Sequence, residues 1–317
     1  MKRVKLFYSI LLTILMKSHV ALGAFSKGTA LVTGSTDGIG VTTAKNLALM
    51  GYDVLVHGRD ESRIKKAEEK IKSFVNGRSE ARIRCLPATD ISTVQGARKL
   101  AQDVIHTCEK EDLDLKVLMN NAGVYSEKHV TTSDGTELTF AVNVVAPFVI
   151  TSRLLPTMIG NGKKERRIVI ASSISQCGSI RDWHDLTYKK RPYSAHGAYS
   201  ESKLLDAMLT FEFADRFKAK GLGVDTITCN CLDPGTVNTK MLLAGWGPCG
   251  IDVDAALDET WLCSSEEVKG VTGKYFTYQS ERPAARSSYD SNERKKMWDI
   301  LSSLAPEEAE MWNFDWL

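Results

Sequence analysis

The sequence predicts an α/β domain whose central sheet is parallel and doubly wound. From residue 29 onward, short and almost continuous apolar runs alternate with longer segments of helical periodicity. Such runs are typical of strands that helices bury on both faces. A glycine-rich turn joins the first apolar run to the first helical segment, and no internal repeat interrupts the pattern. We therefore expect a single domain with a C-terminal substrate loop region.

The expected strands and helices alternate along the chain. The helix at 92–110 is expected to begin at Ser92, because a serine hydroxyl can accept a hydrogen bond from the first turn. The helix at 61–76 carries many charged residues, which we interpret as a solvated face. Strands are expected at residues 29–33, 52–56, 82–86, 116–120, 167–171, 224–232 and 273–277, and the other helices at 39–50, 137–158, 199–218 and 293–304.

The charge balance disfavours nucleic acid as a partner. The 317 residues carry 41 basic and 39 acidic side chains, which gives a formal net charge of +2. Proteins that bind nucleic acid usually carry a marked basic excess. Hydrophobic residues make up 43% of the chain, so a core of this size can fold without disulfides or metal ions.

The seven cysteines are scattered along the chain and show no metal-binding spacing. No pair has the Cys-x-x-Cys pattern, and no run of histidines lies near one. Cys229 and Cys231 are two positions apart in an apolar strand, so both should face the same side. We expect buried core thiols rather than a disulfide framework.

The first 24 residues have the layout of a secretory signal peptide. Lys2, Arg3 and Lys5 precede an apolar run at 6–16, and small residues follow at 21–24. A bilayer needs about 20 apolar residues, so this run is short for a span. An N-terminal membrane anchor and a plain leader are the alternatives. We expect a folded domain at 25–317 and a location in the secretory pathway, the endoplasmic reticulum or another organelle reached by an N-terminal signal.

A glycine-rich turn at Thr33-Gly34-Ser35-Thr36-Asp37-Gly38-Ile39-Gly40 follows the first strand and opens the first helix. Glycines let the backbone turn sharply and approach a pyrophosphate closely. The helix N-terminus then presents free N–H groups to the anion. This context favours a dinucleotide site over the alternative, a tight turn without a ligand.

The end of the second strand reads His57-Gly58-Arg59-Asp60. An NAD site places a carboxylate there to hold the ribose hydroxyls, whereas the planar guanidinium of Arg59 suits a 2′-phosphate. This favours NADP(H) over NAD(H). Asp60 is the counter-argument unless it caps the following helix, and a plain surface cation is the alternative role of Arg59.

Tyr199 and Lys203 are four positions apart in a helical segment and therefore share one face. A cation beside a phenol stabilises the phenolate and lowers the pKa of the tyrosine. Such a tyrosine can give or take a proton near neutral pH. The same spacing on an ordinary surface helix is the alternative.

Together these motifs resemble those of the short-chain dehydrogenase/reductase family, which has a Rossmann fold. They follow the family's order over residues 29–239. The matching motifs are the turn at Thr33–Gly40, Asn120-Asn121-Ala122-Gly123, Asn143 in a helix, Ser172-Ser173 after the fifth strand, Tyr199 with Lys203, and Asp233-Pro234-Gly235-Thr236-Val237.

The resemblance implies catalytic roles for Ser173, Tyr199, Lys203 and Asn143. Tyr199 would be the general acid/base, and Lys203 would hold the nicotinamide ribose and depress the pKa of Tyr199. Ser173, preferred to Ser172, would hydrogen-bond the substrate oxygen. Asn143 would support a water that relays protons to Lys203, although it could simply satisfy buried backbone groups.

The resemblance also implies a cofactor site that includes Tyr199 and Lys203. Asp90 would lie at the adenine, or could be only a helix cap. Asn121 would lie against the adenine ribose, although Asn120 and Asn121 also stabilise the sheet in the family. The remaining cofactor-binding residues would be Gly34, Ser35, Thr36, Gly38, Ile39, Gly40, Arg59, Ala122, Gly123, Pro234, Gly235, Val237 and Thr239.

One departure from the common family pattern is the long interval between Ser173 and Tyr199, which holds the extra segment 180–196. Its stretch Asp185–Tyr193 resembles the retinol-dehydrogenase-like and WW-domain-oxidoreductase-like branch, as does Trp298–Leu301. That branch acts on retinoids, steroids and other lipophilic aldehydes and ketones. The aromatic residues of the segment would fit an apolar pocket wall. A surface loop anchored by its own aromatics is the alternative, and no role is assigned to the histidines of this segment.

These observations predict an NADP(H)-dependent oxidoreductase that acts on CH–OH groups and interconverts a carbonyl and an alcohol. The expected substrate is a small lipophilic molecule, and the family implies a homo-oligomer. Membrane association through the N-terminus is the alternative to a free protein. The competing function is a non-catalytic, redox-sensing scaffold that binds NADP(H). The set of Ser173, Tyr199, Lys203 and Asn143 favours the enzyme.

Overall fold

The computed structural model describes residues 26–317, so the N-terminal prediction for residues 1–24 lies outside the described residues. Within that range the strands form one sheet in the order β3-β2-β1-β4-β5-β6-β7-β8. All neighbouring pairs are parallel except β7 and β8, which are antiparallel. The strands are β1 Thr29–Val32, β2 Asp53–Val56, β3 Ile83–Cys85, β4 Leu115–Asn120, β5 Arg166–Ala171, β6 Ile227–Asp233, β7 Tyr275–Thr277 and β8 Ser280–Arg282.

The expected doubly wound parallel sheet is therefore confirmed. Its strand order reverses between β1 and β4, which are hydrogen-bonded neighbours. Ligands of such sheets bind at the carboxyl ends of the strands beside this reversal. The residues of β1, β2 and β6 are all buried, which explains why apolar side chains predominate in these strands. The sequence analysis missed β8, because the residues of this edge strand are polar and exposed.

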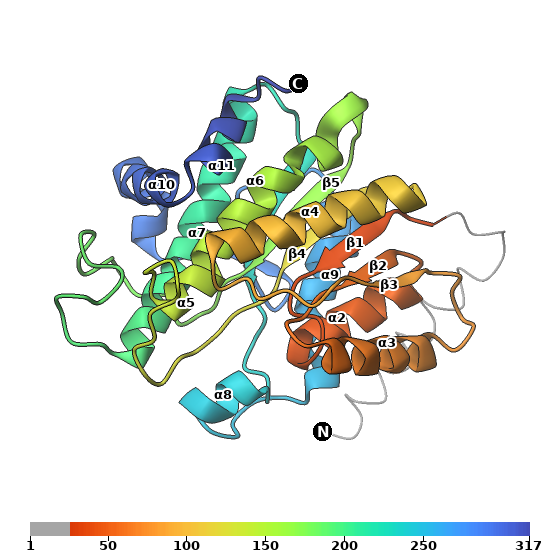
Figure 1. Cartoon of the computed structure of the whole chain (residues 1–317), viewed down its shortest axis with the longest axis horizontal. Coiled ribbons are helices and arrows are strands. Elements are labelled where there is room, and N and C mark those ends of the chain that lie inside the picture. Colours follow the sequence, from red (N-terminus) through yellow and green to blue (C-terminus); the bar gives the residue numbers. More distant parts are fainter. Residues whose placement is uncertain (1–25) are drawn as a thin grey trace.

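Helices cover both faces of the sheet (Figure 1). One core contains side chains from α4 (Val94–Glu111), α6 (Ala146–Ile159) and α7 (Ala195–Ala219). The second core, on the opposite face, contains side chains from α2 (Gly38–Leu49), α3 (Glu61–Val75) and α9 (Asp258–Ser264). Cys229 and Cys231 both point into the first core and are fully buried, as expected.

Several helix boundaries differ from the expectations. Thr93, not Ser92, caps α4, because its hydroxyl accepts a hydrogen bond from the N–H of Gly96 at 3.0 Å. The helix expected at 137–158 consists of α5 (Leu138–Phe140), a π-helical turn (Ala141–Val145) and α6. The helix expected from residue 199 begins at Ala195 because Ser194 caps it.

The segment Leu138–Ile159 is the one helical stretch among the described residues that is long and apolar enough to cross a membrane. Within its most apolar window, 89% of the residues are buried inside the protein. Side chains of α6 pack between the sheet and α4 in the first core. The apolar character of this stretch is therefore explained by the core of the fold.

The C-terminal segment contains α10 (Ser291–Leu304), which packs against α7, and α11 (Pro306–Glu310), which packs against α6 (Figure 1). Trp312 stacks on Phe213 of α7 with ring centroids 4.4 Å apart. Glu308, which is fully buried, accepts hydrogen bonds from Arg98 of α4 and Arg153 of α6. The sequence analysis missed α11, since five residues are too few to show a helical period.

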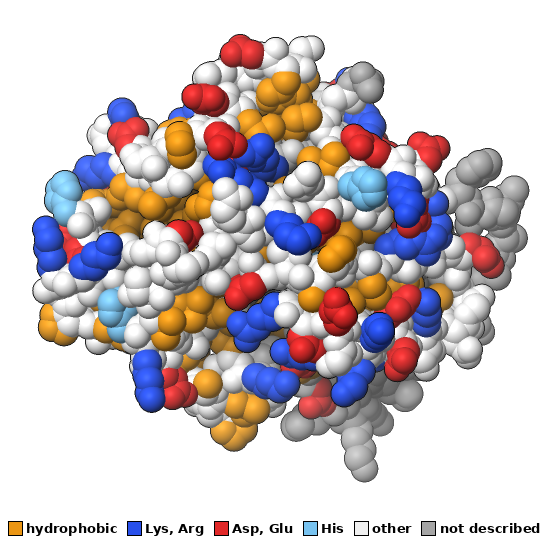
Figure 2. Space-filling view, viewed as in Figure 1, with side chains coloured by type: hydrophobic (Ala, Val, Ile, Leu, Met, Phe, Trp, Pro, Cys, Tyr) orange, Lys and Arg blue, Asp and Glu red, His pale blue; other side chains and the backbone are white. Residues whose placement is uncertain are grey.

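The charged residues of α3 form a solvated face, as expected. Lys72 and Glu68 pair at 2.6 Å on this helix, one turn apart. Figure 2 shows basic and acidic side chains interspersed over the part of the surface where Figure 1 places α3. Exposed pairs of this kind contribute little to stability, so their main effect is to keep this face soluble.

Candidate active site

The glycine-rich turn lies at the carboxyl end of β1, where the strand order reverses. Gly34 has a φ of +67°, a backbone conformation that favours glycine. A Cβ on Gly40 would lie 2.6 Å from the carbonyl oxygen of Gly34 and would also collide with the amide of Asn121. The turn is therefore packed so closely against the loop after β4 that a side chain does not fit at Gly40.

Asn121 holds the turn from the β4 side. Its Nδ2 donates to the carbonyl of Thr33 at 2.6 Å, and its backbone N–H donates to the Thr33 hydroxyl at 3.0 Å. The N–H of Ala122 donates to the same hydroxyl. The structure thus joins the two motifs that the sequence predicted, and it uses the amide of Asn121 to support the backbone.

His57 holds the turn from the β2 side, a role that the sequence analysis missed. Its Nδ1 accepts a hydrogen bond from the N–H of Gly34 at 3.1 Å, and its Nε2 lies 3.0 Å from the carbonyl of Thr89. Burial lowers the pKa of His57 to about 4, so the ring is neutral and donates from Nε2. Ser35 is also buried, and its hydroxyl accepts from the N–H of His57.

Asp60 caps α3, as the NADP(H) interpretation required. Its Oδ1 accepts hydrogen bonds from the N–H of Arg63 at 2.9 Å and from the hydroxyl of Ser62. Arg59 beside it is exposed, and within residues 26–317 its guanidinium forms no ion pair. Asp90 is exposed as well, and its carboxylate accepts from the N–H of Ser92.

Tyr199 and Lys203 lie on one face of α7, next to the carboxyl end of β5. Tyr199 is 8% exposed, and the Lys203 ammonium lies 5.6 Å from the centre of its ring. Lys203 Nζ donates to the carbonyl of Ala171 at 2.7 Å and to Asp206 Oδ2 at 2.8 Å. Burial would lower the pKa of Lys203, but the Asp206 carboxylate raises it above its ordinary value, so Lys203 is a cation.

The pKa of Tyr199 is raised rather than depressed in this structure. Burial is the largest cause, since it disfavours the phenolate. The Lys203 ammonium and the Ser173 hydroxyl act in the opposite direction and limit the rise. Tyr199 is therefore a protonated acid, and the charges around it determine how readily it releases its proton.

The two serines after β5 have different surroundings. The hydroxyl of Ser172 donates to the backbone carbonyl of Lys203 at 2.7 Å and so ties β5 to α7. The Ser173 hydroxyl accepts from the N–H of Ser175 at 3.1 Å and also acts on the Tyr199 phenol. Ser173 is thus the serine on the Tyr199 side, in agreement with the preference drawn from the sequence.

Asn143 lies in the π-helical turn and is buried. Its Oδ1 accepts from the N–H of Val124 at 2.8 Å, and its Nδ2 donates to the carbonyl of Val124 and to the hydroxyl of Ser202. Both amide hydrogens are therefore used within the protein. Asn143 connects the loop after β4 to α7, and its role in a proton relay stays a prediction.

The loop after β6 closes the site from the other side. Thr239 caps the short helix α8 (Lys240–Gly245), and a Cβ on Gly38 would lie 3.3 Å from its Cγ2. Lys240 pairs with Asp37 of the glycine-rich turn at 2.7 Å. The late Pro-Gly motif and the first turn, which are far apart in the sequence, are therefore neighbours in the structure.

The rings of Tyr125 and Trp246 pack against the ring of Tyr199, and His196 packs against both of them. We call these three side chains, Tyr125, His196 and Trp246, the aromatic wall. The ring centroids of Tyr125 and Trp246 lie 5.8 Å and 5.4 Å from that of Tyr199. The Tyr125 hydroxyl and His196 Nδ1 lie 2.9 Å apart. Figure 2 shows hydrophobic side chains at the surface where Figure 1 places α8, and Trp246 is 39% exposed there. The sequence analysis missed this wall.

The extra segment before α7 is anchored by its own polar and aromatic residues. Asp185 accepts hydrogen bonds from the N–H groups of Lys189, Lys190 and Arg191. The Arg191 guanidinium bonds Glu201 of α7, and the Tyr188 hydroxyl donates to the same carboxylate at 2.9 Å. This arrangement agrees with the alternative that its aromatics anchor the loop.

Glu259 of α9 is a buried carboxyl group near the site. Its Oε2 accepts from the hydroxyl of Thr43 at 2.7 Å, while within the described residues its Oε1 has no hydrogen-bond partner. Burial raises the pKa of Glu259 to about 7. A raised pKa means that the folded state holds this proton at pH values where the unfolded chain has already released it.

The wild-type protein is expected to lose stability as the pH rises and Glu259 releases its proton, and Glu259→Gln should abolish this loss. In the wild type, the contribution of this proton is complete below about pH 4.5 and is lost as the pH rises to about 7, at a cost of about 3 kcal/mol. Glutamine can still accept from Thr43 and carries no charge. Urea unfolding at pH 5 and pH 8 measures the effect: the variant should gain about 3 kcal/mol over the wild type between these two pH values, and an unchanged difference would contradict the prediction.

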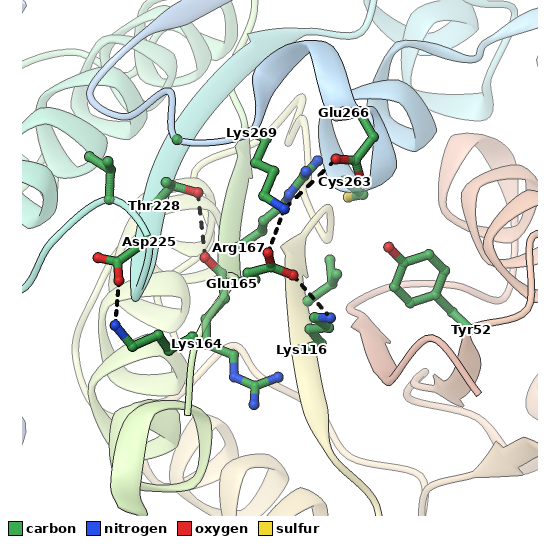
Figure 3. Close-up of a pocket in the computed structure, with 14 residues that line it drawn as sticks. Tyr52, Lys116, Lys164, Glu165, Arg167, Asp225, Thr228, Cys263, Glu266 and Lys269 are labelled. Carbon is green, nitrogen blue, oxygen red and sulfur yellow. Dashed lines mark hydrogen bonds and ion pairs between the residues drawn. The ribbon is translucent and has the colours of Figure 1, made fainter. Parts of the chain in front are cut away.

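A cavity of about 430 Å³ lies at the amino ends of β4, β5 and β6, at the opposite edge of the sheet. Its charged side chains pair with one another (Figure 3): Lys269 reaches Glu165 and Glu266, and Lys116 reaches the other oxygen of Glu165. Lys164 pairs with Asp225. The lysines and carboxylates of this cavity thus pair with one another, and the sequence motifs lie at the carboxyl edge of the sheet, so the chemistry of the protein is expected there.

Comparison of the sequence with known proteins identifies the family of this chain. The model of the family described as short chain dehydrogenase matches residues 28–244. The chain belongs to this family. It is 30% identical to retinol dehydrogenase 13 of Mus musculus over 308 residues, which covers 90% of this chain and 88% of the relative. It is 29% identical to polyprenol dehydrogenase of Homo sapiens over 283 residues, with coverage of 85% and 82%. These relatives confirm the resemblance to the retinol-dehydrogenase-like branch.

Solved structures agree on the fold. The landomycin C-6 ketoreductase LanV with bound NADP and rabelomycin has a TM-score of 0.59 and 24% identity, and covers 80% of this chain and 95% of its own. A short chain dehydrogenase from Burkholderia cenocepacia in complex with NADP has a TM-score of 0.59 and 22% identity, with coverage of 80% and 97%. This protein is therefore a member of an oxidoreductase family with the dinucleotide-binding fold.

Proposed function

We propose that this protein is an NADP(H)-dependent oxidoreductase that interconverts a carbonyl and an alcohol on a lipophilic substrate. The observation that carries the proposal is the position of Tyr199. Its ring lies between the Lys203 cation on one side and the aromatic wall on the other, at the edge of the sheet that holds the glycine-rich turn. A proton donor, a charge-stabilising cation and an apolar surface thus meet at one point.

The glycine-rich turn and the N-terminus of α2 fit a dinucleotide. Gly34 and Gly40 let the turn pack closely against the loop after β4, and this tight turn leads directly into the N-terminus of α2. The free N–H groups of that helix end would bind the pyrophosphate. Arg59 is exposed beside the turn and would hold a 2′-phosphate, and Asp90 would lie toward the adenine. Gly123 and the loop at 234–239 would border the nicotinamide side. When bound, the cofactor supplies the hydride.

In the reducing direction, the residues of the chain handle the proton and the developing charge. Tyr199 donates its phenolic proton to the substrate oxygen as that oxygen gains negative charge. The Ser173 hydroxyl, which already acts on the Tyr199 phenol, would donate to the same oxygen. The Lys203 ammonium stabilises the phenolate that Tyr199 becomes. In the oxidising direction, Tyr199 takes the proton of the alcohol.

The aromatic wall favours a lipophilic substrate. Tyr125 and Trp246 present ring faces and edges beside Tyr199, and such surfaces bind apolar groups. Two relatives with similarity over most of this chain are named retinol dehydrogenase and polyprenol dehydrogenase. We infer that the substrate class is a retinoid, isoprenoid, steroid or similar aldehyde, ketone or alcohol.

We further infer that residues 1–24 are a signal peptide or membrane anchor that precedes the domain at 25–317. The basic residues and the apolar run at 6–16 support this inference. N-terminal sequencing of the mature protein decides between the two: a start near residue 25 indicates cleavage, and an intact N-terminus indicates an anchor.

We expect purified residues 25–317 to oxidise NADPH with retinal, a steroid ketone or a medium-chain aldehyde, and to prefer NADPH to NADH. Arg59→Ala should raise the KM for NADPH about tenfold and leave that for NADH nearly unchanged, because in the proposed site the guanidinium would contact only the extra phosphate. The loss of absorbance at about 340 nm measures the rate with each cofactor and so gives both KM values. Preference for NADH in the wild type would refute the NADP(H) assignment, and absence of turnover with tight NADPH binding would favour the scaffold.

A further inference from the structure

A buried ion pair lies directly behind Tyr199. Lys203 and Asp206 are three positions apart on α7, and the Lys203 ammonium lies 2.8 Å from Asp206 Oδ2. The side chains of the two residues are 5% and 1% exposed. The proposed function uses Lys203 but gives no role to Asp206.

Burial of the Asp206 carboxylate in this position lowers the stability of the folded state. Within residues 26–317 its second oxygen, Oδ1, has no hydrogen-bond partner, and the residue is fully buried. Burial raises the pKa of Asp206 to about 6, against the opposing effect of Lys203. Apolar residues of similar volume often stabilise a fold more than a buried ion pair does. A role at the neighbouring site explains why a carboxylate lies here.

Among the described residues, Lys203 is the one cation that acts on Tyr199 and Asp206. Tyr199, on α7 itself, faces Lys203. Two residues of β6, Cys231 and Asp233, lie near the ion pair. Glu259 of α9 also acts on Lys203. β5 contributes the carbonyl oxygen of Ala171. The nearby groups are therefore acidic or neutral, and Asp206 is the carboxylate in direct contact with the cation.

Asp206 also limits what the ammonium can bind. A lysine ammonium has three N–H donors. One is given to Ala171 and one to Asp206, so that a single donor remains for a ligand such as a ribose hydroxyl. The carboxylate thereby fixes the direction of the third donor and offsets the positive charge that faces Tyr199.

We propose that Asp206 is a positioning residue that holds the Lys203 ammonium and offsets its charge, and that it thereby sets the pH at which Tyr199 releases its proton. This inference rests on the proposed function, in which Tyr199 is the acid/base. The negative charge of Asp206 opposes loss of the Tyr199 proton. Above about pH 6, ionised Asp206 keeps Tyr199 protonated, the form that carbonyl reduction requires. Below that pH, Asp206 is neutral and the cation acts on Tyr199 unopposed.

A direct test is the titration of Tyr199 in protein labelled with ¹³Cζ-tyrosine. The Tyr199 resonance is identified by its loss in Tyr199→Phe, and its midpoint is then read in the wild type and in Asp206→Asn. We expect the midpoint to move to lower pH in the variant, because a fixed negative charge has been removed. An unchanged or higher midpoint overturns the inference.

Two further variants make this result specific. Glu259→Gln neutralises another buried carboxyl that acts on Lys203 without touching it, and it should move the midpoint less than Asp206→Asn does. Asp206→Leu places an apolar side chain of similar volume in the core and should move the midpoint as Asp206→Asn does. An equal shift in Glu259→Gln and Asp206→Asn would contradict a role for the direct contact.

The pH dependence of enzymatic activity is a second test of this inference, and its failure can be distinguished from failure of the proposed function. The ratio of kcat/KM for alcohol oxidation, Asp206→Asn over wild type, should be about 3- to 10-fold at pH 7.5 and should fall toward one below about pH 6. A ratio that is independent of pH overturns the inference. A displaced Tyr199 midpoint in a protein that turns over no substrate would support the inference and refute the proposed function.

Discussion

Replacement of Tyr199 by phenylalanine is expected to lower kcat for carbonyl reduction about 1,000-fold, while the affinity for NADPH changes by less than about twofold. The phenol is the acid group next to both Lys203 and Ser173, and phenylalanine keeps its ring. The ring still packs against Trp246, so the site keeps its shape. Stopped-flow absorbance measures the rate, and NADPH fluorescence measures binding.

Tyr52→Phe is the matched control for this prediction. Tyr52 lines the charged cavity (Figure 3), which lies at the edge of the sheet opposite to that of Tyr199. Loss of its hydroxyl should leave the rate within about twofold of the wild type, as is usual for a change away from the reacting atoms. If Tyr199→Phe keeps more than about a tenth of the wild-type rate, another group supplies the proton and the assignment of Tyr199 is wrong.

Trp312→Ala is expected to lower the free energy of unfolding by about 3–5 kcal/mol. The indole is 5% exposed, and it stacks on Phe213 with an angle of 9° between the ring planes. Its Nε1 donates to the hydroxyl of Ser152 at 2.7 Å, a bond that alanine cannot replace. The variant would leave a cavity between α7 and the C-terminal segment, and the Ser152 hydroxyl would keep only its bond to the carbonyl of Phe148.

Urea unfolding followed by far-UV circular dichroism measures this change. Trp246→Ala removes the same side chain from an exposed position on the aromatic wall, and it should cost less than about 1 kcal/mol. Equal losses in the two variants would show that the C-terminal segment does not belong to the cooperative core.

The sheet could be predicted because buried parallel strands are apolar along their whole length. Val54, Leu55 and Val56 of β2 are fully buried, so their sequence pattern is unbroken. The short edge strand β8 and the short helix α9 could not be found in this way. Their residues are too few to show a period, and those of β8 are exposed.

Part of the candidate site could also be predicted from a regular sequence spacing. Tyr199 and Lys203 lie on one helix, where a spacing of four positions already places them on a common face. Asp206 lies three positions after Lys203 on the same helix, so the same spacing argument could have found it. His57 and Trp246 act through contacts between segments that are far apart in the sequence. No spacing marks these two residues, so only the folded structure shows what they touch.

The two segments on either side of Tyr199, the one before α7 and the one that contains α8, differ in how firmly they are attached. The segment before α7 is fixed by a buried carboxylate, Glu201, which binds Arg191 and Tyr188 together. The α8 side is attached to the glycine-rich turn through the exposed pair of Lys240 and Asp37, and exposed pairs contribute little. If the proposed substrate class is correct, the far end of a long, chain-like molecule would leave the site past α8, while its reactive end would lie against the firmly attached segment before α7. Chain length could then vary among acceptable substrates without any change at the reacting carbon.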